Sequence, residues 1–157
     1  MILYHGTNIV IRQIDLSHSN RYKDFGRAFY LSADYGQAQK MADNRADFLG
    51  GQPVINPFFF DETLMYSAEL QIKMFPHYSV EWAEFIWNNR DEKQDFHHPY
   101  DIVYGPIMND TIGFQMREYR KKHTDVHGFL DGIKYEKGET FQYAFCTERA
   151  VKLLTRQ

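Results

Sequence analysis

The sequence predicts a single domain of the α+β class. Segments with the twofold alternation of strands and segments with helical spacing follow one another without a regular strand–helix repeat, which argues against a doubly wound sheet. The chain has 157 residues, of which 43% are hydrophobic and 25% charged, so it is long enough and apolar enough to bury a core. Because no internal repeat or linker interrupts it, we expect one domain over residues 1–157.

The N-terminal region is expected to begin with a strand over residues 2–5, in which Leu3 and His5 share one face. A short strand or extended segment is expected at residues 9–11. The polar residues 15–23 then predict a loop.

Residues 24–32 predict a loop that leads into a strand, with Gly26 as a flexible entry. From Arg27 onward the side chains alternate, which directs Phe29 and Leu31 to the core. The other face carries small or polar side chains and would suit the wall of a cleft. These side chains are Ala28, Tyr30 and Ser32.

The middle of the chain predicts a helix over residues 34–49, with Asp34 as its N-cap. Its inward stripe is expected to contain Tyr35, Ala38, Met41, Ala42, Ala46 and Leu49. Residues 53–57 are expected to be irregular, residues 58–60 fit no single assignment, and residues 64–75 predict a strand.

The C-terminal half predicts further elements of both kinds. Ser79 and Thr147 are expected to cap helices. Strands are expected at residues 100–104 and 141–146, and helices at residues 111–122 and 125–135. In the last strand Gln142, Ala144 and Cys146 face away from the bulky residues Phe141, Tyr143 and Phe145.

The composition limits the classes of function. The net charge of −3 argues against a protein held to nucleic acid mainly by phosphate neutralisation. Cys146 is the single cysteine, so an internal disulfide is excluded. The chain has neither a leader-like N-terminus nor an apolar run of membrane-spanning length, so we expect a cytoplasmic protein that does not contact a membrane.

Three strands each place one polar residue on the face opposite the bulkiest side chains. These residues are His5, Tyr30 and Gln142. We therefore expect the three side chains to converge on one cleft, with each strand packed on one face only.

A set of ordered motifs resembles the ADP-ribosyltransferase superfamily. The motifs are Tyr4-His5-Gly6-Thr7, residues 24–32 with Gln37-Ala38, residues 81–90, residues 100–106 and residues 142–154. The resemblance is to the branch typified by diphtheria toxin and the poly-ADP-ribose polymerases, which reads His, Tyr, Glu, and within it to a bacterial family. It implies split antiparallel β-sheets with flanking helices, and NAD as a co-substrate.

The resemblance also implies roles for single residues. His5 would bond the ribose next to the nicotinamide, the Gly6 backbone would pair with the nicotinamide amide, and Tyr30 would pack on the ring. The wider NAD-binding set would add Thr7, Arg27, Ser32 and Met41. Cleavage of the nicotinamide–ribose bond develops positive charge on the sugar, so the site needs a grip on the leaving group and stabilisation of a cation.

The sequence departs from the motif at three positions. Ala28 stands where the family has glycine, Met41 stands at a second stacking aromatic, and Gln142 replaces the catalytic glutamate. Glutamine can bond a ribose hydroxyl but cannot supply a negative charge. Glu139 is the expected substitute acid, and Gln142→Glu is expected to raise nicotinamide release.

The function implied by the resemblance is mono-ADP-ribosyl transfer to a protein or nucleic acid acceptor, with a toxin, defence or signalling role and a small companion or antitoxin protein as partner. The alternatives are an NAD- or ADP-ribose-binding module with weak catalysis and an NAD glycohydrolase. No metal is expected, because His123 and His127 lack further ligands nearby. A basic run at Arg117, Arg120, Lys121 and Lys122 is typical of a solvated helix face and could also touch nucleic acid.

Overall fold

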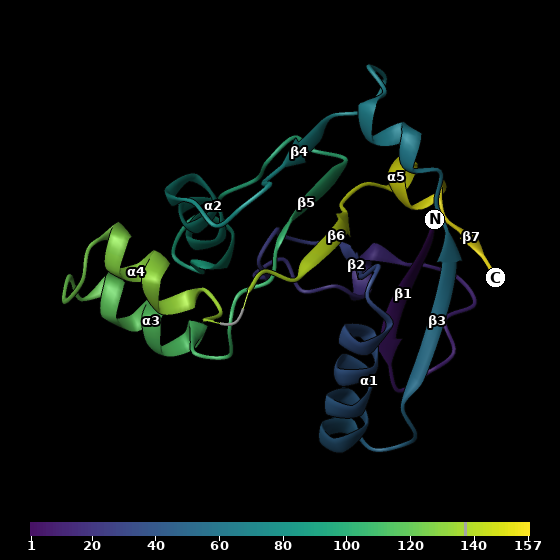
Figure 1. Cartoon of the computed structure of the whole chain (residues 1–157), viewed down its shortest axis with the longest axis horizontal. Helices are drawn as coiled ribbons and strands as arrows, with labels where there is room; N and C mark the ends of the chain where they lie inside the picture. Colours follow the sequence, from purple (N-terminus) through teal and green to yellow (C-terminus); the bar gives the residue numbers. More distant parts are fainter. Residues whose placement is uncertain (137) are drawn as a thin grey trace.

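The computed structural model describes residues 1–136 and 138–157 and has a mixed α+β fold (Figure 1). Its strands are β1 (Ile2–Thr7), β2 (Phe29–Leu31), β3 (Val54–Phe59), β4 (Ile72–Met74), β5 (Ile102–Pro106), β6 (Phe141–Phe145) and β7 (Thr155–Arg156). Its α-helices are α1 (Tyr35–Leu49), α2 (Val80–Arg90), α3 (Ile112–Arg120), α4 (Val126–Ile133) and α5 (Glu148–Val151). Two short 3-10 helices are η1 (Leu16–His18) and η2 (Glu62–Tyr66).

The strands form two sheets. One has the order β1-β3-β7 and is antiparallel, and the other has the order β2-β6-β5-β4, in which only β4 and β5 run parallel. The sheets meet where Tyr4 and Ser32 exchange two backbone hydrogen bonds of 2.8 and 2.9 Å. This contact fixes β1 beside β2 and brings the first two predicted motifs together.

Both faces of the four-stranded sheet are covered. One hydrophobic cluster joins this sheet to the other sheet and includes Leu3, Phe29, Leu31, Phe58 and Phe145. A second cluster joins the opposite face to α2, α3 and α4 and includes Ala28, Trp82, Val103, Phe129 and Ala144. The prediction that each strand packs on one face only is therefore wrong, because Ala28 and Ala144 are buried beneath this helical layer.

Helix α1 packs on β1 (Figure 1). Asp34 caps it as predicted, accepting hydrogen bonds from the backbone of Gly36 and Gln37. Its buried stripe is only the three alanines Ala38, Ala42 and Ala46. The prediction that Tyr35, Met41 and Leu49 also face inward is wrong, since about half of each side chain is exposed. Small residues alone fit because the helix lies against the strand backbone.

The strand β3 contradicts the irregular segment predicted from Pro53 and Pro57. Pro57 lies opposite Tyr4, and Tyr4 already exchanges its backbone hydrogen bonds with Ser32 on its other side. The missing N–H of Pro57 therefore removes no bond of the ladder to β1. Pro57 is therefore tolerated in β3, the central strand of its sheet, because its partner Tyr4 forms its hydrogen bonds with Ser32 beside the other sheet.

The strand predicted over residues 64–75 is confirmed only in part, and the segment at residues 9–11, expected to be a short strand or extended, is not a strand. Over residues 64–75 only Ile72–Met74 is extended, because Asp61 caps η2 by accepting a hydrogen bond from the Thr63 backbone. The segment at residues 9–11 joins no sheet. The buried Asn56 side chain holds it instead, by bonding the Ile11 N–H at 2.8 Å and the Ile9 carbonyl at 3.0 Å.

The C-terminal half follows the predicted order. Ser79, Asp125 and Thr147 cap α2, α4 and α5 by accepting backbone hydrogen bonds, and β5 and β6 pair side by side. The final helix is one turn long, and β7 returns the chain to β3. Across residues 1–136 and 138–157, none of the helices combines the length and apolarity that crossing a bilayer requires.

Candidate functional site

His5 is fixed in one tautomer by its contacts in β1. Its Nδ1 lies 2.7 Å from the Tyr30 carbonyl, which only accepts, so Nδ1 carries the proton. The ring stacks on Phe29 with centroids 4.3 Å apart. Burial lowers the pKa of the imidazole, the hydrogen bond to Tyr30 opposes this, and the charges of Lys23 and Arg45 lower it further. His5 is therefore neutral at pH 7, and its Nε2 has a free lone pair, since within the described chain no group bonds that nitrogen.

The backbone of Gly6 is open on the side away from β3. Tyr4 directs its N–H and carbonyl to Ser32, and strand alternation directs those of Gly6 to the same side, beyond the end of the bridge. Among the residues described, Gly6 makes no hydrogen bond on that side. A Cβ at this position would lie 1.9 Å from the Ala38 carbonyl oxygen, so only glycine permits the approach of α1.

Tyr30 in β2 points its ring away from Phe29 and toward the loop that precedes the strand. Its hydroxyl donates to the Gly26 carbonyl at 2.7 Å and accepts from the Phe25 N–H at 3.0 Å. Gly26 has φ of +81°, a conformation that favours glycine and lets the loop fold back over the strand. Burial, followed by the charge of Asp24, raises the pKa of the phenol well above its usual value, so Tyr30 stays neutral.

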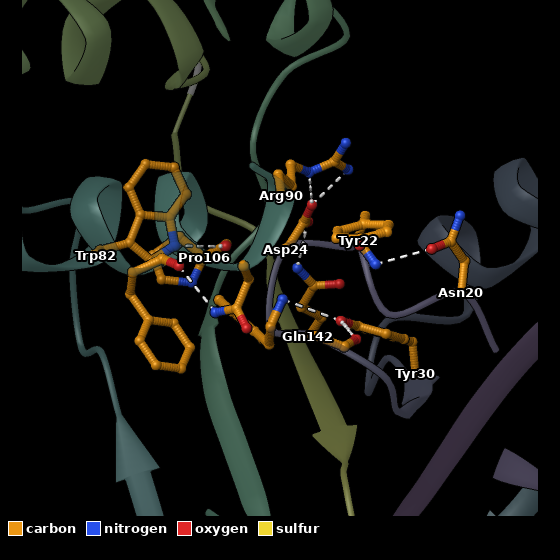
Figure 2. Close-up of polar contacts among 12 residues, drawn as sticks. Asn20, Tyr22, Asp24, Tyr30, Trp82, Arg90, Pro106 and Gln142 are labelled. Atoms are coloured by element: carbon orange, nitrogen blue, oxygen red, sulfur yellow. Dashed lines mark hydrogen bonds and ion pairs between the residues drawn. The ribbon is translucent and has the colours of Figure 1, made fainter. Parts of the chain in front are cut away.

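Gln142 in β6 binds a buried carboxylate. Its Nε2 donates to Asp24 Oδ2 at 2.9 Å, and Asp24 Oδ1 receives Arg90 Nη2 at 2.6 Å and Nε at 2.7 Å. Figure 2 shows Arg90, Asp24, Gln142 and Tyr30 following one another across the site. The amide orientation follows from this pairing, because a carboxylate needs the NH₂ end. The Oε1 atom of Gln142 is left without a partner in the described part of the chain.

Glu139, the acid expected to stand in for the glutamate, is committed elsewhere. It accepts hydrogen bonds from the Tyr78 N–H and from His77, both at 3.1 Å. Glu148 lies in the first turn of α5. The acid in contact with Gln142 is Asp24, so the prediction of Glu139 is corrected.

The other predicted residues lie around this centre with differing roles. Thr7 and Ser32 are buried, and the Ser32 hydroxyl accepts a hydrogen bond from the Asp34 N–H at the start of α1. Arg27 is exposed, and no ion pair involves it in the described residues. Met41 is 48% exposed, one helical turn before Arg45, whose charge acts on His5. A contact of Met41 with a flat ring stays a prediction.

His5 bonds the backbone carbonyl of Tyr30, and its ring packs on Phe29, on the face of β2 opposite the Tyr30 ring. The prediction that the side chains converge is therefore wrong for His5 and Tyr30. Gln142 bonds Asp24. Sequence reasoning missed Asp24 and Arg90. Both lie inside segments that carry the resemblance, and a buried carboxylate between a strand amide and an arginine has no signature in residue alternation. The one sequence feature that pointed to Asp24 was its position directly before Phe25-Gly26, at the start of the loop that leads into β2.

These residues offer distinct chemical functions. His5 Nε2 accepts a hydroxyl proton, the Gly6 backbone can pair with a planar amide, and Gln142 Oε1 presents a negative dipole. Lys23 and Arg45 add positive charge near His5, and the Lys23 amine lies 5.5 Å from the Tyr30 ring centroid. These groups suit a ligand with a hydroxylated sugar, an amide and anionic groups.

By its fold the protein is a mixed α+β protein with two sheets. The chain belongs to the family described as "Protein of unknown function (DUF3990)", whose model matches residues 1–155. Searches of curated proteins and of solved structures gave no match.

Proposed function

We propose that the protein is an NAD-dependent mono-ADP-ribosyltransferase with an ADP-ribosyltransferase-like split-sheet fold. The single observation that carries the proposal is the neutral His5, held by the Tyr30 carbonyl with its Nε2 lone pair free, beside the open backbone of Gly6. One strand thus offers an acceptor for a ribose hydroxyl and a donor–acceptor pair for a carboxamide. NAD carries both groups on neighbouring units.

In the proposed reaction, the bond between the ribose carbon and the nicotinamide nitrogen breaks, and its electron pair leaves with neutral nicotinamide. An acceptor oxygen or nitrogen forms the new bond to the same carbon, and its proton passes to solvent. His5 and Gly6 hold the ribose and the leaving group, and Tyr30 borders the ring. Interactions that strengthen as charge develops on the sugar lower the barrier.

Gln142 would face the developing cation with its amide oxygen. Because its Nε2 donates to Asp24 at 2.9 Å, the amide is polarised and Oε1 becomes more negative. Asp24 adds a negative charge behind the amide, although Arg90 offsets part of it. The site therefore retains some cation stabilisation without a glutamate.

The same residues would support NAD glycohydrolysis if water replaces the acceptor, or binding of NAD or ADP-ribose without turnover. Gln142 is the observation that favours weak turnover. A cytoplasmic toxin, defence or signalling effector with a companion protein is the setting that the resemblance suggests.

The test is nicotinamide release from NAD by the purified protein, with free ADP-ribose measured alongside. We expect release by the wild type and a fall of about a hundredfold or more for His5→Ala. His18→Ala is the matched control, because its side chain is 85% exposed. A folded wild type that binds NAD and releases no nicotinamide would establish the binding module, and release with equal free ADP-ribose would establish the glycohydrolase.

A further inference from the structure

A cavity of ≈ 360 Å³ opens beside Arg90, on the side of the Asp24 carboxylate away from Gln142. The loop before β2 contributes Asn20 and Tyr22, and Figure 2 shows Tyr22 near Arg90, with Asn20 beyond it. Its remaining lining is Arg90, Glu92, Lys93, Met116 and Arg120. The lining contains three cations and one acid, and two of the cations are paired with the buried carboxylates of Asp24 and Asp91.

Two of these cations, Arg90 and Arg120, are each fixed by an ion pair with a buried carboxylate. Arg90 pairs with Asp24, and Arg120 Nη2 lies 2.9 Å from Asp91 Oδ1, while the carboxylate side chains are only 10% and 7% exposed. Each guanidinium has five N–H groups, so the pairing leaves donors for a ligand. Fixed guanidinium forks are the groups best suited to bind phosphate oxygens.

Helix α3 extends the positive charge beyond the lining. Arg117 lies one helical turn from both Arg120 and Lys121, and Lys122 follows. In the part of the chain that the structure describes, Lys93, Arg117, Lys121 and Lys122 form no ion pair. The charge is therefore locally concentrated in a chain whose net charge is −3.

An aromatic ring completes the cavity. The Arg21 guanidinium lies 5.1 Å from the centroid of the Tyr22 ring, which adds a planar cation to a planar ring. Phosphate-binding cations combined with an aromatic platform are typical of sites for single-stranded nucleic acid, where bases stack on rings. A cavity serving only inorganic phosphate would not need the ring.

From these features we propose that the cavity binds a single-stranded nucleic acid and presents it as the acceptor. The proposal rests on the proposed function. Arg90 bonds Asp24, and Asp24 bonds Gln142, so a strand held by Arg90 lies two contacts from the reacting centre. A hydroxyl or base nitrogen of the strand attacks the ribose carbon, nicotinamide leaves with the bonding electrons, and the proton of the attacking group goes to solvent.

The test measures fluorescence anisotropy of a labelled RNA strand, and of the matching DNA strand, about 12 nucleotides long. The variant Lys93→Gln/Lys121→Gln removes two unpaired surface cations and leaves both buried ion pairs intact. We expect about a tenfold loss of affinity and a salt dependence that falls by about 1.4 in log–log slope. Lys40→Gln/Lys152→Gln is the matched control, with the same charge change at exposed positions elsewhere, and should bind as the wild type does.

Absence of binding at low salt, or equal losses in variant and control, would overturn the proposal. Displacement of the strand by NAD would do so too, because the cavity would then serve the phosphates of NAD. A final arm follows label from NAD into the strand, and release of nicotinamide without labelling would overturn the acceptor role. Strand binding by a protein that releases no nicotinamide would instead refute the proposed function and leave the nucleic acid site standing.

Discussion

By the resemblance to ADP-ribosyltransferases, Gln142 occupies the position of the catalytic glutamate, and its side chain donates a hydrogen bond to a second acid, Asp24. From the sequence, Gln142→Glu is expected to restore a missing charge. With Asp24 Oδ2 only 2.9 Å from the amide nitrogen, the substitution would replace a hydrogen bond by two facing carboxylates. Like charges at this separation raise the pKa of one of them and keep it protonated.

We therefore expect Gln142→Glu to leave nicotinamide release at or below the wild-type rate at pH 7 and to lower the melting temperature. The double variant Gln142→Glu/Asp24→Asn removes the repulsion and should release nicotinamide about tenfold faster or more. Initial rates of the three proteins at equal concentration check this. A faster single variant would mean that Asp24 does not act on position 142.

Gly6 shows how one backbone contact fixes the position of a helix. Gly6→Ala would force its Cβ toward the Ala38 carbonyl oxygen, and neither strand nor helix can move alone. We expect a loss of about 1–3 kcal/mol in the free energy of unfolding, or more. Chemical denaturation measures it. Gly113→Ala is the control, since a Cβ there meets only the Arg117 side chain at 3.7 Å, and the change should be neutral or stabilising.

At the scale of elements, Asp101 ties the start of β5 to its neighbours. Its carboxylate accepts hydrogen bonds from Gln71 N–H at 2.8 Å, the Thr147 hydroxyl at 2.7 Å and Arg149. The Arg149 guanidinium lowers the pKa of Asp101 well below its usual range, burial opposes this, and the other two bonds add to the lowering. This carboxylate ties α5 and the start of β4 to β5.

We expect Asp101→Asn to cost about 2–3 kcal/mol at pH 7. Because the folded pKa is below the unfolded one, the unfolded chain takes up the proton first as the solution is acidified. The stabilisation is therefore complete above roughly pH 4 and is lost progressively below it. Unfolding curves from pH 7 to pH 3 should show the gap between wild type and variant narrowing only below roughly pH 4. A gap that stays constant would exclude the titration of Asp101 as its source.

Elements whose cause is local could be predicted from sequence. Caps such as Asp34 and Ser79 act within three residues, and the alternation in 141–145 reports which side chains share a face. Pro57 shows the limit, because it becomes acceptable only through the register of Tyr4 with a strand from the other sheet. Asp24 is the same case in the site, since its partner Gln142 is 118 residues away.

At the scale of the whole molecule, the reactivity of the Cys146 thiol measures how well the helices stay packed on the four-stranded sheet. It lies at the end of β6 with Sγ near the Ala144 and Phe25 carbonyls, and burial raises its pKa to about 12. We expect its reaction with a disulfide reagent at pH 8 to be about a hundredfold slower in the native protein than in denaturant. Absorbance of the released thiolate gives both rates. Rapid reaction of the native protein would mean that the layers open without global unfolding.

The order β2-β6-β5-β4 differs from the order of these four strands along the chain. Strand β6 lies between β2 and β5, yet it is the last of the four to leave the ribosome. Before β6 is made, β2 and β5 lack the strand that lies between them. Asp24 likewise lacks its hydrogen bond from Gln142. Sheet closure depends on contacts far apart in sequence, which slows folding. During synthesis, the proposed activity therefore requires that β6 has been made.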